Sequence, residues 1–344
     1  MDTHINNSPA VSIIIVNWNG IKWLEKCLTS LRAQSFQDFE IIFVDNASTD
    51  ESVVYVRKHF PEVHIIESSV NLGFAWGNNL WCEHSKWKYI YLLNSDTDSS
   101  KNSLQELIDF IGKDPDIAII QPQLLLMNDP EYYDAVATYW TYTTMLFYDG
   151  AYTHVWDLKY HKPCETYSIK GAACMIRKTV IDKIGLFDDT YWCYFEETDF
   201  CHRCWLSGYK VLYANTSPVY HAGWGASLKF ENSFIQFHNF KNKLRTYFKN
   251  FSWLTLLYVI PMHFIVCTIL IIYYSFKSHK KGVAIIKSLL WNIQNLSDTL
   301  EQRKKIQKNR KVYDYKYISR LMRNPPIKYY YYLLTDLKKY GKIR

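Results

Sequence analysis

Residues 11–20 read VSIIIVNWNG, an apolar and β-branched run followed at once by asparagines and a glycine. A run of this kind is typical of a strand buried on both faces in a parallel sheet. Three further runs have the same character: EIIFV at 40–44, VHIIES at 63–68 and YIYLL at 89–93. Working outward from the first, we predict an α/β domain built on a mainly parallel, Rossmann-like sheet flanked by helices.

The segments between the predicted strands are predicted to be helices, so strands and helices alternate along the chain. Apolar residues recur at helical spacing over 21–34, 50–60 is a second predicted helix, and 80–85 lies in a third. Right-handed crossovers place the strand carboxyl ends along one edge of the sheet, where open α/β sheets bind their ligands. That edge then receives the polar residues that directly follow predicted strands: Asn17, Asp45 and Asp96.

Two segments are candidates for binding a nucleotide. In VDNASTD (44–50), a carboxylate at Asp45, next to Asn46, can accept a hydrogen bond from a pyrimidine N–H; the alternative is a helix-capping cluster in which Asp50 is the cap. In NLGFAWGNN (71–79), backbone can approach a ligand closely and the following helix start suits a diphosphate, although an ordinary loop fits as well. The candidates in this segment are Asn71, Gly73, Gly77 and Asn78.

A third segment, LLNSDTD (92–98), delivers Asn94, Asp96 and Asp98 to the end of a predicted buried strand. Hard oxygen ligands two residues apart suit Mg²⁺ or Mn²⁺ shared with phosphate oxygens. An acidic turn is the alternative interpretation, because Asp and Ser also favour turns. The position after a buried strand favours metal binding through Asp96.

A fourth segment, 170–225, places Glu196, Glu197 and Asp199 at the predicted start of a helix. Acidic residues there complement the helix dipole, but three within four positions exceed that need. Repulsion among them raises the pKa of one carboxyl, as suits a general base that removes a proton from an acceptor hydroxyl. Neighbouring candidates for contact with an acceptor are Trp192, Tyr194 and Gly171.

In this order, the four segments resemble family 2 glycosyltransferases, in particular the rhamnosyltransferase-like branch of bacterial O-antigen, capsule and cell-wall synthesis. The resemblance covers about residues 10–250 and implies the GT-A fold, a nucleobase contact at Asp45 and a divalent metal at Asp96. The family usually shows Glu-Asp-x-Asp where this chain has Glu196-Glu197-Thr198-Asp199. Glu197 therefore matches the catalytic Asp with one extra methylene, and Glu196 or Asp199 is the alternative. His221, in VYHAGWG, matches a metal-ligand histidine of some relatives.

The resemblance implies an inverting, in-line transfer of a sugar, rhamnose among the candidates, from a dTDP- or UDP-linked donor to a saccharide hydroxyl. A polyprenyl-diphosphate-linked acceptor would account for the membrane features of the chain. Three other readings stay open. They are a catalytically silent membrane scaffold, a zinc site using Cys193, Cys201, Cys204, His202 and His221, and a nucleic-acid binder; no nucleic-acid motif is visible.

Charge divides the chain unevenly. Residues 277–344 hold 18 Lys/Arg and 4 Asp/Glu, a net +14, so the total of +7 leaves −7 for residues 1–276. Between the halves, 250–276 has no charged side chain and is long enough to span or lie in a bilayer. Because Lys241, Lys243, Arg245 and Lys249 precede it and the basic tail follows, we predict an interfacial or re-entrant hairpin that breaks near Pro261.

The predicted organisation has three parts: a catalytic domain at 1–250, membrane-associated helices at 251–300 and a basic tail at 301–344. The polar amino-terminal residues show no secretory signal, and eight cysteines in 344 residues are too sparse for a disulfide scaffold. We therefore expect the protein at the cytoplasmic face of the cell membrane, with a membrane surface as a partner and no nucleic acid.

Overall fold

The computed structural model describes residues 10–82, 87–223 and 230–342. Its centre is an eight-stranded mixed sheet with the order β11-β13-β6-β12-β4-β1-β2-β3. The predicted strands form one parallel half: β1 (Val11–Asn17), β2 (Phe39–Asn46), β3 (His64–Ser68) and β4 (Tyr89–Leu93). The other half consists of β6 (Ile117–Gln121), β11 (Cys164–Glu165), β12 (Ala173–Arg177) and β13 (Lys210–Tyr213). The predicted α/β class is confirmed.

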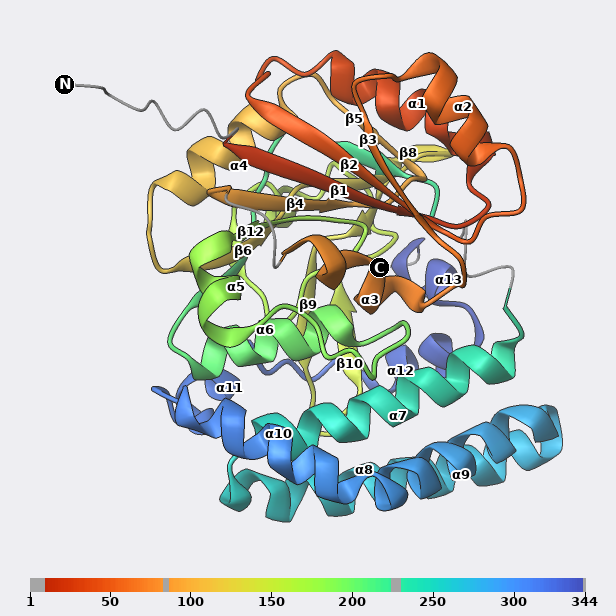
Figure 1. Cartoon of the computed structure of the whole chain (residues 1–344). Helices are drawn as coiled ribbons and strands as arrows, with labels where there is room; N and C mark the ends of the chain where they lie inside the picture. The colour runs from red at the N-terminus through yellow and green to blue at the C-terminus, as the bar shows by residue number, and fades with distance from the viewer. Residues whose placement is uncertain (1–9, 83–86, 224–229, 343–344) are drawn as a thin grey trace.

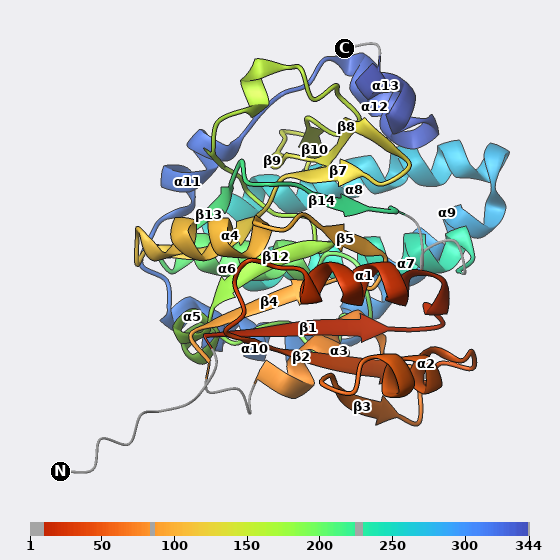
Figure 2. The ribbon, with the colours of Figure 1, turned by 90° about the horizontal axis from the view of Figure 1, so that it is seen from above.

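Alternate residues of β1 enter two hydrophobic layers, one on each face of the sheet (Figures 1 and 2). Ile13 and Ile15 pack in the layer that includes α1 and α4, whereas Ile14 packs in the layer that includes α3, α5 and α6. A strand covered on both faces has to be apolar throughout, as its sequence is. These helices are α1 (Ile21–Arg32), α2 (Ser52–His59), α3 (Gly73–Cys82), α4 (Ser103–Gly112), α5 (Lys178–Ile184) and α6 (Glu196–Leu206).

A four-stranded sheet stands beside the main one and brings distant segments together. Its order is β5 (Thr97–Ser99), β14 (Val219–His221), β7 (Leu124–Leu126) and β8 (Asp129–Ala135). Because β14 pairs antiparallel with β5, His221 lies opposite Thr97, directly after Asp96. A separate hairpin joins β9 (Ala137–Trp140) and β10 (Leu146–Asp149), and a short 3₁₀ turn follows at Leu158–Tyr160.

The carboxyl-terminal third is helical and lies below the sheet in Figure 1. Its helices are α7 (Asn232–Asn250), α8 (Trp253–Lys277), α9 (His279–Gln294), α10 (Leu296–Lys308), α11 (Asp314–Leu321), α12 (Ile327–Thr335) and α13 (Leu337–Lys342). Helix α10 runs across residue 300, where the sequence suggested a boundary. Tyr317, Tyr329 and Tyr340 of the basic tail are buried against residues of the first 250 positions, so much of that tail belongs to the core.

Helix α8 corrects the predicted hairpin, because it passes through Pro261 without a break and the chain turns instead at Ser278. Proline costs the helix the bond to the Leu257 carbonyl, but packing of Leu256, Val259 and His263 holds the turns on either side. In the described part of the chain, α8 is the one helix long and apolar enough to cross a membrane.

One face of α8 is covered by the protein and the other is both apolar and exposed. The exposed stripe follows helical spacing, with Leu254 at 80 % and Phe276 at 85 % exposure near its two ends. Leu257, Ile265, Ile269 and Ile272 lie between them. A contiguous apolar surface of this kind marks a contact with lipid or with another protein.

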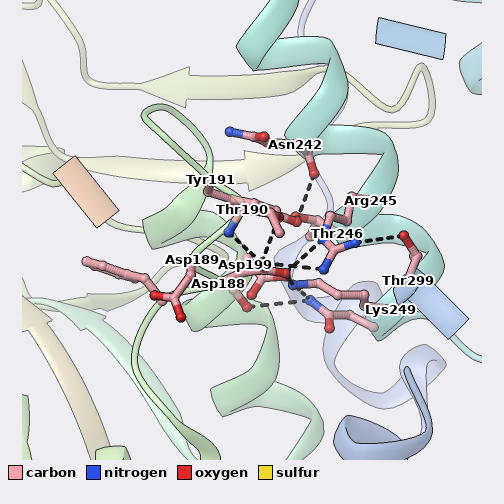
Figure 3. Close-up of polar contacts among 12 residues, drawn as sticks. Asp188, Asp189, Thr190, Tyr191, Asp199, Asn242, Arg245, Thr246, Lys249 and Thr299 are labelled. Atoms are coloured by element: carbon pink, nitrogen blue, oxygen red, sulfur yellow. Dashed lines mark hydrogen bonds and ion pairs between the residues drawn. The ribbon is translucent and has the colours of Figure 1, made fainter. Parts of the chain in front are cut away.

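The four cations ahead of α8 do not flank a membrane segment as the sequence suggested. Lys241, Lys243, Arg245 and Lys249 of α7 are all buried, because α7 turns its polar side into the core. Arg245 Nε lies 2.9 Å from Asp188 Oδ2, and Lys249 Nζ bridges Asp188 and Asp199 (Figure 3). These contacts join α7 to the 188–195 loop and to α6.

This buried network predicts a large loss of stability on removal of Asp188. In Asp188→Ala, two buried cations lose a shared carboxylate, which costs roughly 3–5 kcal/mol of unfolding free energy. The exposed Arg32–Glu62 pair supplies the control, because Glu62→Ala should cost about 0–1 kcal/mol. Denaturant unfolding at neutral pH measures both, and equal losses would contradict the interpretation.

The network also fixes the direction of the pH dependence of stability. Burial alone would raise the pKa of Asp188, but Lys249 and Arg245 hold it well below its usual range. A depressed folded pKa stabilises the fold above the unfolded pKa of about 3.9, and this contribution is lost as the pH falls further. The destabilisation caused by Asp188→Ala should therefore shrink steadily below about pH 4.

Candidate active site

A cleft of about 690 Å³ opens at the carboxyl ends of β1, β2 and β4, between the main sheet and α6. Most of the candidate residues line it, although they come from six separate segments of the chain. They are Asn46, Asn71, Gly73, Asn94, Asp96, Gly171, Trp192, Tyr194, Glu196, Glu197 and His221. The remaining candidates, Asn17, Asp45, Gly77, Asn78, Asp98 and Asp199, are not among the side chains that line it.

Asn17 and Asp45 lie side by side at the ends of β1 and β2, as the parallel register dictates. Asn17 Nδ2 donates to Asp45 Oδ1 at 3.3 Å, and the Ser48 backbone N–H donates to Asp45 Oδ2 at 2.9 Å. Both side chains are buried. They brace the two strand ends directly beside the lining residue Asn46.

Asn46 holds the 71–73 turn against the cleft. Its Nδ2 donates to the Gly73 carbonyl at 3.0 Å, and its Oδ1 accepts from the Leu72 backbone N–H at 2.9 Å. Gly73 has φ +86°, and a Cβ at this position would lie 2.2 Å from the Trp192 carbonyl oxygen. Only glycine fits here, because this turn packs backbone to backbone against the 188–195 loop.

The structure contradicts a cleft position for Gly77 and Asn78. Helix α3 already begins at Gly73, so these residues lie inside it and not in a loop that precedes it. A Cβ on Gly77 would lie 2.9 Å from Val16 Cγ1, and Asn78 Nδ2 donates to the Phe74 carbonyl of the preceding turn. Gly77 permits close packing of α3 on β1, and Asn78 bonds within its own helix. The predicted helix at 80–85 lies partly outside the described residues.

A chain of polar contacts leads from the cleft into the core. His221 Nε2 lies 3.3 Å from Asp96 Oδ1, and His221 Nδ1 lies 2.8 Å from Asp134 Oδ2. Lys170 Nζ in turn lies 2.6 Å from Asp134 Oδ1. Burial alone would lower the pKa of His221, but hydrogen bonds to Asp134 and Asp96 raise it to about 9. Asp134 thereby orients the ring so that Nε2 faces Asp96.

Asp98 does not join this group. Strand β5 begins at Thr97, which is buried, so the alternation of side chains turns Asp98 away from the cleft. Its carboxylate instead lies 3.1 Å from Lys26 Nζ of α1. No group of three or more His, Cys, Asp or Glu side chains in the described ranges is arranged to hold a metal ion.

Glu196 and Glu197 open α6 at the edge of the cleft. Two consecutive left-handed residues precede them, Tyr194 with φ 67° and Phe195 with φ 73°. Such conformations cost free energy in residues other than glycine and persist only where the surroundings impose them. Asn242 of α7 imposes this one, since its Nδ2 donates to the Cys193 carbonyl at 2.9 Å and to the Tyr194 carbonyl at 2.6 Å.

The two glutamates share a poorly solvated environment. Burial raises the pKa of both carboxyls, and the charge of Glu197 raises that of Glu196 further, whereas Lys170 opposes the shift at Glu197. On each, Oε2 accepts no hydrogen bond from the described part of the protein. Glu197 is the more exposed of the two. The pair therefore offers the cleft a carboxylate of raised basicity.

Asp199 is held away from the cleft on the inner side of α6. It is completely buried, and its oxygens contact Arg203 Nε at 2.8 Å, Lys249 Nζ at 3.1 Å and Asn250 Nδ2 at 3.0 Å. Three residues on from Glu196, it faces α7. The structure thus gives Asp199 a structural position and removes it as an alternative base.

Three residues of the alternative zinc site, Cys201, Cys204 and His202, are also held in the core. Cys201 and Cys204 are buried in α6, and both ring nitrogens of His202 bond to tyrosine hydroxyls, those of Tyr167 and Tyr317, at 2.9 Å. These side chains belong to the core that joins α6 to α11.

Sequence reasoning missed several residues of the site. Trp18 lines the cleft and stacks on Phe230 at 5.1 Å; its place directly after the first strand, beside Asn17, was the available signal. Lys170 was detectable as the charged residue before Gly171 in an otherwise apolar segment. Nothing in the sequence marks Asp134, because β8 reaches His221 only through the pairing of the small sheet.

Comparison with known sequences identifies relatives. The family model described as "Glycosyl transferase family 2" matches residues 12–183. The chain is 24 % identical over 237 residues to the low-salt glycan biosynthesis hexosyltransferase Agl10 of Haloferax volcanii, a match covering 68 % of this chain and 74 % of that protein. It is 21 % identical over 234 residues to N-acetylglucosaminyl-diphospho-decaprenol L-rhamnosyltransferase of Mycobacterium tuberculosis, covering 61 % and 75 %.

Solved structures resemble the fold. A crystal structure of GalNAc-T7 with UDP, GalNAc and Mn²⁺ aligns with a TM-score of 0.56 and 17 % identity over 70 % of this chain, which spans 48 % of that longer one. The structure of the mannosyltransferase PcManGT of Pyrobaculum calidifontis, in complex with GDP-Man and Mn²⁺, aligns with a TM-score of 0.51 and 12 % identity. That alignment covers 88 % of this chain and 86 % of the mannosyltransferase. The strand order, the cleft at the strand ends and the family match agree: this chain is a glycosyltransferase with the GT-A fold and belongs to glycosyl transferase family 2.

Proposed function

We propose that the protein transfers a sugar from a nucleotide-diphosphate donor, with inversion, to a hydroxyl of a lipid-linked saccharide at the cytoplasmic face of a membrane. The observation that carries the proposal is that Asp96, His221, Glu196 and Glu197 all line one cleft. A metal-facing carboxylate and a basic carboxylate in one cleft are what in-line transfer requires.

Glu197 is the proposed base. It lines the cleft, it is more exposed than Glu196, and burial raises its pKa to about 7. Lys170 and the pairing of the two glutamates tend to leave the proton on Glu196. Trp192 and Tyr194 are the proposed acceptor contacts beside it, with Gly171 opposite.

Nucleotide binding is proposed for the ends of β1 and β2. Asn46 bonds to Gly73, whose backbone N–H bonds to Asn71, and these three residues offer amide and backbone groups to a base and a diphosphate, with the buried Asp45 carboxylate next to Asn46 as the proposed base contact. Asn17 acts through Asp45, which it contacts directly. A dTDP-linked rhamnose is one candidate donor among dTDP- and UDP-linked sugars.

The residues present fit a divalent metal at Asp96. One carboxylate lines the cleft, and His221 presents Nε2 beside it while Nδ1 is held by Asp134, an arrangement common around metal-binding histidines. Mg²⁺ and Mn²⁺ need few protein ligands when diphosphate oxygens supply the others. A bound metal would neutralise the charge that develops on the departing diphosphate.

A membrane location is supported by the exposed apolar face of α8. The opposite face of that helix packs on the protein through Leu256, Val259 and Leu270, so the geometry favours a helix lying in the membrane surface over one that spans it. The name of one relative includes a decaprenol-linked substrate, which also supports a membrane location.

The first functional prediction concerns Glu197. Glu197→Gln should lower kcat by roughly 10²–10⁴-fold, because the amide cannot remove a proton, and should leave the KM for the donor nearly unchanged. A screen of dTDP- and UDP-sugars, with release of nucleoside diphosphate as the readout, first identifies the donor. Glu196→Gln is the matched control and should lose less. Full activity of Glu197→Gln would disprove the assigned base.

The second functional prediction concerns the metal site. Asp134→Asn should weaken Mn²⁺ binding about 10–100-fold, because His221 loses the charged group that orients it. Titration of Mn²⁺ in the presence of UDP, followed by electron paramagnetic resonance, measures this without any need for turnover. Asp98→Asn is the control and should bind as wild type. An equal loss in both variants would argue against this site.

The third concerns the membrane. The triple variant Leu257→Gln, Ile265→Gln, Ile272→Gln should reduce co-sedimentation with anionic phospholipid vesicles at least tenfold, since each aliphatic side chain contributes about 1.5–3 kcal/mol on burial. Val54→Gln, Leu158→Gln, Ile327→Gln removes equally exposed side chains elsewhere. Point changes are preferable to deletion of 250–344, because Arg303 and Gln307 bond to the end of α7. Undiminished vesicle binding by the α8 variant would show that this face of α8 is not the membrane contact.

A further inference from the structure

A second cavity lies outside the cleft, between the first turns of α7 and α9. Its volume is about 470 Å³. Its lining is mostly apolar and includes Phe234, Phe237, Val283 and Ala284, and the side chains of Ser233, Lys280 and Lys287 complete it. We call it the α7–α9 groove.

The sequence of α9 explains this division. Positions 280, 283, 284 and 287 recur at helical spacing, so they form one face of the helix, with lysines at both ends and small apolar residues between them. Helices α7 and α9 run in the same direction, so both amino-terminal ends meet at this groove (Figure 1). Neither helix has an acidic residue in its first turn.

The rim of the groove is therefore positive. Two helix amino termini add their partial charge to the two lysines. The nearest opposing carboxylate is Glu231, whose Oε1 lies 3.5 Å from Lys280 Nζ; both side chains are largely exposed, so water screens that pair. A ligand suited to this groove has an anionic group next to an apolar chain.

A single layer of aromatic rings separates the groove from the cleft. Phe234 lines the groove, and its ring lies 5.1 Å from Trp192 and 5.0 Å from Phe230. Trp192 and Phe230 line the cleft on the other side. The groove and the cleft therefore lie on two sides of the same group of aromatic rings.

The groove also adjoins the exposed apolar face of α8. Helix α8 ends at Lys277 and α9 begins at His279, so Phe276, which is 85 % exposed, precedes the groove residue Lys280 by four residues across the turn at Ser278.

We propose that the α7–α9 groove binds the prenyl-diphosphate end of the acceptor. Lys280 and Lys287 contact the diphosphate, the floor holds the first isoprene units, and the saccharide passes Trp192 to reach the cleft. This assignment rests on the proposed transfer to a lipid-linked saccharide, and it adds the place where the lipid carrier is recognised.

The first test measures binding alone. The full chain, in neutral detergent with EDTA to keep diphosphate from the donor site, is titrated into fluorescently labelled geranyl diphosphate and followed by anisotropy. Lys280→Glu, Lys287→Glu should weaken binding tenfold or more, and Lys304→Glu, Lys308→Glu on α10 is the charge-matched control. Val283→Gln should also weaken it. Unlabelled geranyl diphosphate should compete at least tenfold better than inorganic pyrophosphate or geraniol.

Three results would overturn the proposal. Equal competition by pyrophosphate would indicate an anion site only, and an equal loss in the α10 control would indicate bulk charge. If Lys280→Glu, Lys287→Glu weakens vesicle binding but not binding of geranyl diphosphate, the lysines contact lipid headgroups instead.

A transfer assay separates this proposal from the function on which it rests. For Lys280→Glu, Lys287→Glu, the ratio of kcat/KM for a prenyl-diphosphate-linked saccharide to that for the same saccharide on a neutral alkyl group should fall tenfold or more. Absence of transfer by wild type to either acceptor would reject the proposed function, and the binding result would still decide the groove. An unchanged ratio, with wild type active, would reject the groove.

Discussion

The polar face of α7 holds the site together. Arg245 and Lys249 lie in the interior and reach Asp188 and Asp199 on two different segments, while Asn242 bonds to the carbonyls that precede α6. Burying cations is unfavourable unless they are paired. Each pairing therefore restricts where the 188–195 loop can lie, and that loop sets the position of the glutamates.

The same loop contacts the 71–74 segment at Gly73. The Trp192 carbonyl accepts from the Phe74 backbone N–H at 2.7 Å, and the absence of a side chain on Gly73 allows this approach. Asn46 fixes the 71–73 turn from the other direction. The 71–74 segment and the 188–195 loop, which line two sides of the cleft, are thus in direct contact through main chain.

Sequence alone predicted the parts governed by local pattern. The apolar runs at 11–16, 40–44 and 89–93 are strands, and their order in the sheet brings Asn17, Asp45 and Asp96 to one edge. Patterns failed where tertiary packing overrides a local preference. The start of α3 depends on a contact between Gly73 and a loop 119 positions further along the chain.

The four cations of α7 and Pro261 led to wrong predictions because tertiary packing overrides the local pattern there as well. Four cations in the nineteen residues of α7 resemble a solvated or membrane-flanking helix, yet their partners on the 188–195 loop and α6 place them inside. The pairing of His221 with Asp134 likewise depends on sheet order, which a single sequence does not encode in any local pattern.

The left-handed pair Tyr194–Phe195 has a consequence for how this enzyme fails when it is heated. The strained backbone of these two residues can relax once the hydrogen bonds from Asn242 of α7 break, whereas the apolar core of the sheet does not depend on those bonds. Catalysis and global folding then have separate thermal limits. We therefore expect activity to be lost at a lower temperature than the one at which the sheet unfolds, and to return when a briefly heated sample is cooled.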